Sequence, residues 1–236
     1  MKLYIIKINI LFILLSIVTE SYAQSTNLIR YYENAKVGYK DGSGKIIVQP
    51  NYVAGSEFSE GFAIVLRDGK RGYIDAKGEV AIPFIYQDAS LFVNGIACVM
   101  LNGKYGFINT TGQIIIPADF DYVENFSEGL ALATKAGKTG FINKTGSYVI
   151  APQYDKAMSF KNGLTTVMSK GKWGYINSIG KIILPLKYDH ASLFMADGTA
   201  QAYFGKEGFK INRKGKVLEK LKDPEEEEKE EKRVNK

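Results

Sequence analysis

The chain has 236 residues, of which 45% are hydrophobic and 24% charged, and this balance excludes wholesale disorder. Its formal net charge is +6, but it has no Arg-rich cluster of the kind that binds nucleic acid, so we expect no nucleic-acid partner. Tyr and Phe are plentiful (15 and 13 residues) while Trp, Cys and His occur once each, which favours strands joined by tight turns.

The first 23 residues have the pattern of a secretory signal peptide. Lys2 and Lys7 provide positive charge, Ile8 to Val18 form an apolar run, and Ser21-Tyr22-Ala23 offers small residues for cleavage after Ala23. The alternative is a retained membrane anchor, but the run is shorter than the roughly 20 residues that cross a bilayer. We therefore predict no retained membrane span and export to the periplasm, the cell surface or the extracellular space.

The sequence that follows is dominated by a repeat of 34 residues. Glycines recur at this spacing, each followed by an aromatic residue: Gly38-Tyr39, Gly72-Tyr73, Gly106-Phe107, Gly140-Phe141, Gly174-Tyr175 and Gly208-Phe209. A second aromatic column keeps the same register: Phe58, Phe92, Phe126, Phe160 and Phe194. Self-similarity at a fixed period indicates that each repeat is one supersecondary unit.

Each unit is predicted to be a three-stranded antiparallel meander. An apolar first strand, such as Ile96 to Met100, leads into a turn such as Asn102-Gly103, whose residue types allow the positive φ angles of a tight hairpin. The second strand carries the Gly-aromatic pair. The third is β-branched, as in Ile114 to Ile116, and we expect Pro117 to stop it. We expect the following linker, clearest in Tyr154 to Gly163, to be an irregular or one-turn helical crossover.

Six complete units fit between residues 24 and 221, which we predict to form one β-repeat array. The last unit carries one extra residue between Gly208 and Gly215, as terminal repeats often do. Two architectures fit: an open curved or superhelical array, and a six-bladed, propeller-like ring. We favour the open array because each unit offers three strands whereas propeller blades usually hold four, and because no overlap of the first and last strands closes a ring.

The fifth unit carries the fullest motif, from Gly171-Lys172-Trp173-Gly174-Tyr175-Ile176-Asn177 to Lys181-Ile182-Ile183-Leu184-Pro185. It resembles the bacterial tryptophan–glycine (WG) repeat family, whose motif is near Gly-Lys-Trp-Gly-Tyr-Ile-Asp-x-x-Gly-Lys-x-x-Ile-Pro. The resemblance covers about residues 28–218 and implies an all-β repeat protein, often exported, with no catalytic residues to carry over. The chain departs from the family at the tryptophan, where the other units have Val37, Arg71, Tyr105, Thr139 and Glu207.

The sequence shows no catalytic, cofactor-binding or metal-binding site. His190 stands in a column whose other members suit a solvated linker: Ala54, Asp88, Tyr122 and Lys156. A role as general base or metal ligand is disfavoured, since the chain has no other His and no free second Cys to complete a site. Cys98 has no disulfide partner within the chain and is predicted to be a small buried hydrophobe.

Two polar columns are explained by turns rather than by a ligand. One holds Asp121, Asp155 and Asp189, and the other holds Asp75, Asn109, Asn143 and Asn177. Such side chains bond to neighbouring backbone groups. No repeat gathers the several oxygen ligands that a calcium site needs. We therefore predict a protein that is not an enzyme and has no cofactor.

The C-terminal residues 222–236 are predicted to form a charged disordered tail, rich in Glu and poor in apolar residues. Subtracting the tail and the signal leaves about +7 on the folded body, which we expect to be mild and spread along its length. Such a charge permits attraction to anionic envelope polymers.

The leading functional hypothesis is a protein–protein interaction scaffold in the cell envelope or outside the cell, whose partner is an unknown envelope or extracellular protein. The variable column 37/71/105/139/173/207 is expected to give each unit a different exposed chemistry. The alternative is a carbohydrate- or peptidoglycan-binding module, which predicts a row of solvent-facing Tyr side chains. An enzyme would need a site built from Asp, Glu, Lys or Tyr alone.

Overall fold

The structure, a computed structural model, describes residues 28–221. The predicted signal peptide (1–23) and tail (222–236) lie outside the described residues. The described segment contains no helix long and apolar enough to cross a bilayer.

Six antiparallel sheets follow one another along the chain. The first strands of their meanders are β1 (Ile29–Glu33), β5 (Phe62–Arg67), β9 (Ile96–Leu101), β13 (Ala131–Lys135), β17 (Leu164–Ser169) and β21 (Thr199–Phe204). The middle strands are β2 (Lys36–Lys40), β6 (Lys70–Asp75), β10 (Lys104–Asn109), β14 (Lys138–Ile142), β18 (Lys172–Asn177) and β22 (Glu207–Asn212). The third strands are β3 (Ile46–Tyr52), β7 (Val80–Tyr86), β11 (Ile114–Phe120), β15 (Tyr148–Tyr154), β19 (Ile182–Tyr188) and β23 (Val217–Lys220). The predicted all-β array of six meanders is confirmed.

The linkers differ from the expected irregular or helical crossover. Each begins with a two-residue strand that pairs with the first strand of the next meander: β4 (Ala54–Gly55), β8 (Asp88–Ala89), β12 (Tyr122–Val123), β16 (Lys156–Ala157) and β20 (His190–Ala191). Five of the six sheets described therefore have four strands. Four of the five linkers then turn through an Xaa-Gly pair with two positive φ angles, as at Asn94 (52°) and Gly95 (75°), which starts the next hairpin directly. In the fifth linker only Gly198 has a positive φ, of 77°.

The third strands continue past the prolines that were expected to stop them. In the third unit Tyr105 pairs with Phe120, and Phe107 pairs with Ile116, so Pro117 and its neighbours bulge opposite Gly106. Proline is tolerated at a bulge because no ladder hydrogen bond is needed from it there. The glycine column is explained by the same bulge: a Cβ at Gly106 would lie 2.5 Å from the Ile116 carbonyl oxygen.

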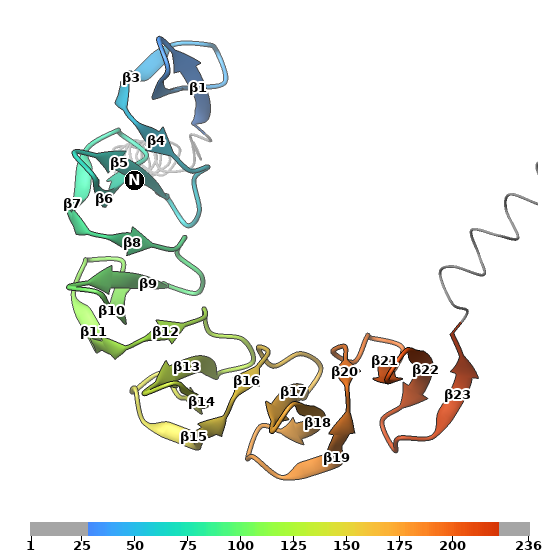
Figure 1. The fold of residues 1–236 in the computed structure, drawn as a ribbon. Helices are drawn as coiled ribbons and strands as arrows, with labels where there is room; N and C mark the ends of the chain where they lie inside the picture. The colour runs from blue at the N-terminus through green and yellow to red at the C-terminus, as the bar shows by residue number, and fades with distance from the viewer. Residues whose placement is uncertain (1–27, 222–236) are drawn as a thin grey trace, which may run out of the picture.

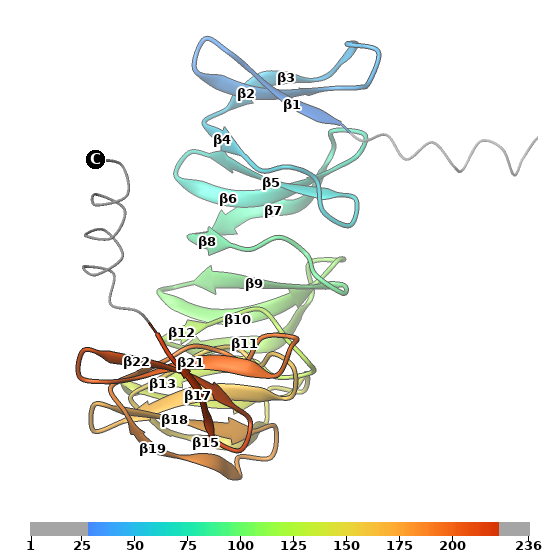
Figure 2. The same cartoon turned by 90° about the vertical axis from the view of Figure 1, so that its right-hand side faces the viewer.

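The core lies between consecutive sheets rather than within one layer. The first core cluster combines Tyr39 and Val48 of the first sheet with Ala63, Val65 and Ile74 of the second, all at most 8% exposed. Four further clusters repeat this arrangement along the array. Figure 2 shows the first sheets stacked one above another. Every inner sheet thus buries one face against its predecessor and the other against its successor.

The array is open and bent. Its first sheet (β1–β3) and its last sheet (β20–β23) lie at opposite ends of an arc, as Figure 1 shows. The third strands run along the outside of the bend, and the linkers that follow the short strands lie on the inside. The open array is therefore correct and the ring is not formed, although the strand count that favoured this choice was wrong.

The last unit is out of register with the predicted glycine column. Tyr203 pairs with Gly208 and Gln201 with Lys210, whereas in the second unit Leu66 pairs with Arg71 and Ile64 with Tyr73. The extra residue consequently lies upstream, in the linker before β21, and Gly208 rather than Glu207 occupies the variable column. Lys210 takes the position of the buried aromatic residue in this terminal sheet.

Candidate functional site

The linkers on the inside of the bend form a ladder between repeats. Ser59 Oγ donates to the Phe92 carbonyl at 2.8 Å, and the Glu60 carboxylate accepts the backbone N–H groups of Asn94 (2.6 Å) and Gly95 (2.8 Å). Ser127 and Glu128 repeat these bonds two units later: Ser127 Oγ donates to the Phe160 carbonyl and Glu128 accepts from Gly163 N–H. Polar side chains of this inner surface are thus engaged in joining consecutive sheets.

The recurring aspartates form a second link between repeats. Asp155 accepts from Lys138 Nζ of the preceding hairpin at 2.5 Å and from the backbone N–H of Lys170 in the following hairpin at 2.8 Å. Asp189 does the same with Lys172 and Gly205. The hydrogen bonds from Lys138 and Lys172 lower the pKa of Asp155 and of Asp189 below the ordinary Asp value. These aspartates therefore act across repeats, beyond the local turn role predicted for them.

The Asp/Asn column before the second turn has the predicted local role. Asn143 Oδ1 accepts the backbone N–H groups of Thr145 (3.0 Å) and Ser147 (3.1 Å), and the other members bond in the same pattern. The backbone groups of the turn saturate this side-chain oxygen, so the column offers no free ligand set.

The variable column is not the exposed row that was predicted. Val37 and Thr139 are buried, while Arg71, Tyr105 and Trp173 are half-buried. These middle-strand side chains point towards the short strand of the next sheet: Arg71 Nη1 lies 3.1 Å from Asp88 Oδ1, and the Tyr105 ring is 6.0 Å from that of Tyr122. The column fills the space between sheets, so its variation reflects local packing.

The rare residues show no reactive arrangement. Cys98 in β9 is a free thiol largely covered by its neighbours, and burial raises its pKa. His190 is exposed and pairs with Tyr203 through the backbone. Over residues 28–221 no three His, Cys, Asp or Glu side chains come together in a way that could hold a metal ion. An apolar cavity beside Phe107 and Ala118 has a volume of about 10 Å³, roughly one water molecule.

The tyrosines do not form the solvent-facing row that a carbohydrate-binding module predicts. Within the described part of the chain, Tyr32 (64%) and Tyr122 (47%) are the tyrosines with the largest exposed fractions. Tyr32 belongs to β1 of the first sheet and Tyr122 to the short strand β12 of the fourth, so the two rings share no column. Most other described tyrosine rings are buried between sheets, and Tyr73 and Tyr175 are fully buried.

An apolar stripe crosses the array instead. The first residues of the third strands share a β-branched, exposed side chain in most sheets: Ile46 (44%), Val80 (48%), Ile114 (54%), Ile182 (54%) and Val217 (49%). We call these five residues the outer stripe, because their strands run along the outside of the bend (Figure 1). Aligned exposed apolar side chains of this kind are typical of protein contact surfaces.

Comparison with known proteins identifies the repeat. The sequence model of the WG containing repeat matches residues 38–70, 72–105, 105–138, 140–173 and 173–206. No curated protein matches the chain in sequence.

Two solved structures are similar to the chain at low sequence identity. A crystal structure of the eukaryotic initiation factor has a TM-score of 0.53 and 13% identity over 84% of this chain and 63% of that one. Kluyveromyces lactis Hsv2 with a complete loop 6CD has a TM-score of 0.47 and 9% identity over 69% of this chain and 60% of that one. The chain thus spans less than two thirds of either structure, and the likeness concerns the fold alone.

Proposed function

The chain belongs to the WG-containing repeat family, and from this premise we propose that it is an exported scaffold that binds a protein of the cell envelope or the extracellular space without catalysing a reaction. Family and fold support a repeat-based interaction module. Our proposal goes further in two respects. Export is proposed from the signal-peptide pattern of residues 1–23, and a protein partner is proposed from the exposed surface of the array.

The outer stripe is the observation that carries this proposal. Each of its side chains leaves close to half of its surface in water, and stacked sheets lie about 10 Å apart, so the stripe is an apolar line that recurs in five of the six sheets described. The fourth sheet interrupts it with the half-buried Tyr148. A protein surface can cover the segments of such a line on both sides of this interruption. A hydrophilic glycan would need stacking aromatic rings or free polar groups there, and the stripe offers neither.

The proposal is tested by crosslinking capture from the envelope of the protein's own cells, using tagged residues 24–236 and identification by mass spectrometry. A stripe variant replaces Ile46, Val80, Ile114 and Ile182 by Thr, which keeps a β-branched residue in each strand. A matched control makes four exposed apolar-to-Thr changes away from the stripe: Val53, Ile85, Val93 and Met195.

We expect one recurrent protein, captured in stoichiometric amount by the wild-type chain and by the control, and lost with the stripe variant. Equal capture by both variants would show that the stripe is not the contact. If no protein is captured and the chain is instead retained on purified wall polysaccharide, the scaffold is refuted and the carbohydrate-binding alternative takes its place.

A further inference from the structure

The net charge of the described body is concentrated in its last two sheets. Residues 28–155, which build the first four sheets, contain 12 Lys and Arg against 13 Asp and Glu, a net charge of −1. Residues 156–221 contain 12 Lys and Arg against 4 Asp and Glu, a net charge of +8. The expectation that the charge is spread along the body was therefore wrong. We call residues 156–221 the basic platform.

Four lysines of the fifth repeat account for much of this asymmetry, because each replaces a neutral or acidic residue of its column. Lys156 stands where the preceding repeats have Ala54, Asp88 and Tyr122, and Lys161 where they have Ser59, Val93 and Ser127. Lys170 replaces Asp68, Asn102 and Ala136, and Lys187 replaces Asn51, Ile85, Asp119 and Gln153. Packing does not demand these changes, since all four side chains are exposed.

The four lysines are available for a ligand. Across residues 28–221 none of them takes part in an ion pair, in contrast to Lys172, whose Nζ is held by Asp189. Lys187 Nζ lies 5.4 and 5.7 Å from the centroids of the Tyr188 and Phe204 rings, contacts that leave its hydrogen-bonding protons free for an anion. Uncompensated positive charge of this density attracts anions and raises their local concentration.

The positions of the four lysines favour a flexible ligand over a flat one. Lys161 and Lys170 flank the two ends of β17, a six-residue strand about 20 Å long. Lys156 lies in the short strand β16, next to the linker on the inside of the bend, and Lys187 lies in β19 on the outside (Figure 1). A planar lipid surface could meet only one of these sides at a time, whereas a flexible chain can follow all of them.

We propose that the basic platform binds a flexible linear polyanion with phosphate groups along its chain. The platform's 12 cations include 11 Lys and one Arg. Lysine acts as a compact point charge towards phosphate, whereas arginine provides bidentate recognition of a fixed geometry. Binding is therefore governed by charge density and is strongly dependent on salt. The four lysines are not stripe residues, although Ile182 and Val217 of the outer stripe lie in the same two sheets. The proposal does not depend on the proposed protein partner.

The test uses the mature chain and long-chain inorganic polyphosphate as the probe, with the fluorescence of Trp173 as the signal. Trp173 is the single tryptophan of the chain and lies in β18 within the platform. The platform variant K156A/K161S/K170N/K187Q places in each column a residue that another repeat of this chain carries there. Asn at position 170 tolerates the positive φ of 51°. Thermal unfolding of both proteins checks that the variant is folded.

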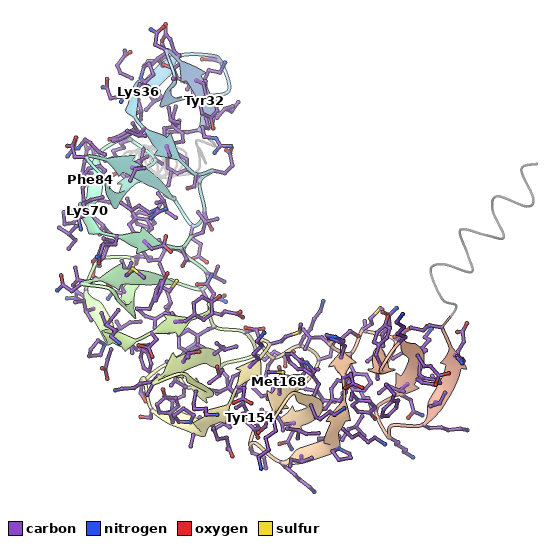
Figure 3. All side chains as sticks on the ribbon, viewed as in Figure 1. Tyr32, Lys36, Lys70, Phe84, Tyr154 and Met168 are labelled. Atoms are coloured by element: carbon purple, nitrogen blue, oxygen red, sulfur yellow. The ribbon has the colours of Figure 1, made fainter. Side chains whose placement is uncertain are left out.

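A matched control removes the same charge from the other end of the array: K36Q/K45Q/K70Q/K77Q. Figure 3 labels Lys36 and Lys70, which lie in the first two sheets, far along the arc from the platform. All four control lysines are exposed, and none of them is in an ion pair within the described part of the chain. Both variants have the same net charge, so any difference in their affinity for polyphosphate is due to where the removed lysines lie.

We expect the platform variant to bind polyphosphate at least tenfold more weakly and to lower the slope of log K against log salt by about 2–3, while the control changes affinity less than twofold. Equal weakening by both variants would show that only net charge matters and would overturn the proposal. So would tighter binding to phosphatidylglycerol vesicles or to duplex DNA than to polyphosphate, since either would replace the flexible polymer by a flat or a stiff ligand.

Discussion

Gly174 offers a direct test of why a glycine recurs in the middle strand of the first five repeats. Its Cα faces the bulge of β19, and a Cβ there would lie 2.7 Å from the Leu184 carbonyl oxygen and 2.8 Å from Leu186 N. Both atoms belong to the backbone, so the bulge itself would have to move. Forcing a methyl group into such a packed site typically costs about 1–3 kcal/mol, and we expect Gly174→Ala to lie near the upper value.

Gly171 is the matched control, three residues away in the hairpin turn. It has a positive φ of 74°, and nothing lies within 4 Å of its Cβ position, so its cost is conformational alone, about 1 kcal/mol for Ala. Asn separates the two causes. Because Asn accepts positive φ, Gly171→Asn should restore most of the loss. Gly174→Asn should be at least as unstable as Gly174→Ala because its side chain meets the same backbone.

The assay is urea unfolding followed by the fluorescence of Trp173, which lies next to Gly174. With a slope of about 1–3 kcal/mol per molar urea, a loss near 3 kcal/mol moves the midpoint by about 1 M or more. A Gly174→Ala midpoint equal to that of the wild type would refute the close-approach explanation. A Gly174→Asn variant more stable than Gly174→Ala would also refute it, because the glycine would then be needed for its backbone conformation.

Three further predictions concern single contacts, pH and the ends of the array. Tyr73→Phe removes the 2.8 Å hydrogen bond from Tyr73 Oη to the Ser90 carbonyl. The ring alone fits this position, because the next repeat has Phe107 there. Calorimetric unfolding should therefore show that the free energy of unfolding falls by about 1 kcal/mol. The lowered pKa values of Asp155 and Asp189 mean that their ionised carboxylates stabilise the folded state. This stabilisation is complete above the unfolded Asp pKa of about 3.9, and it is lost as pH falls through the lower pKa values of the folded state. The urea midpoint of the D155N/D189N variant should thus change less than that of the wild type between pH 6 and pH 2, and an equal change would contradict the pairing. The double variant K40I/K210Y should associate end to end, detected by sedimentation as growing oligomers, whereas an unchanged monomer would show that these lysines do not protect the ends.

Most of the fold could be predicted from the sequence because its determinants are local and repeated. The Asn102-Gly103 pair predicts a tight hairpin, and both residues have the positive φ it requires, 51° and 77°. The short strands could not be found in this way. Asp88 and Ala89 form one only because Val99 and Met100 of the next hairpin offer a free edge, and a two-residue strand has no periodicity of its own.

The same contrast holds for the candidate surfaces. The variable column was expected in solvent, because variation among repeats is typical of exposed positions. Its burial depends on the spacing between sheets, which places Arg71 against Asp88 and is not readable from one repeat. The platform lysines, however, were visible in the sequence. Lys187 stands where other repeats have Gln153 and Asp119, so the columns themselves locate the added charge.

The two terminal sheets show how the array ends and where its recognition surfaces must be. Lys40 pairs with Ile46 at the position where the inner sheets bury Ile74, Ile108, Ile142 and Ile176, and Lys210 occupies the position of the buried aromatic column. A contact between the last face of one copy and the first face of another would repeat without closing, as in a filament, and would bury both charges without a partner. The faces between sheets must pack against one another, so their residues are similar from repeat to repeat, and the end faces carry Lys40 and Lys210. Residue types that packing does not fix can therefore vary between repeats only along the sides of the array, where the outer stripe and the basic platform are found.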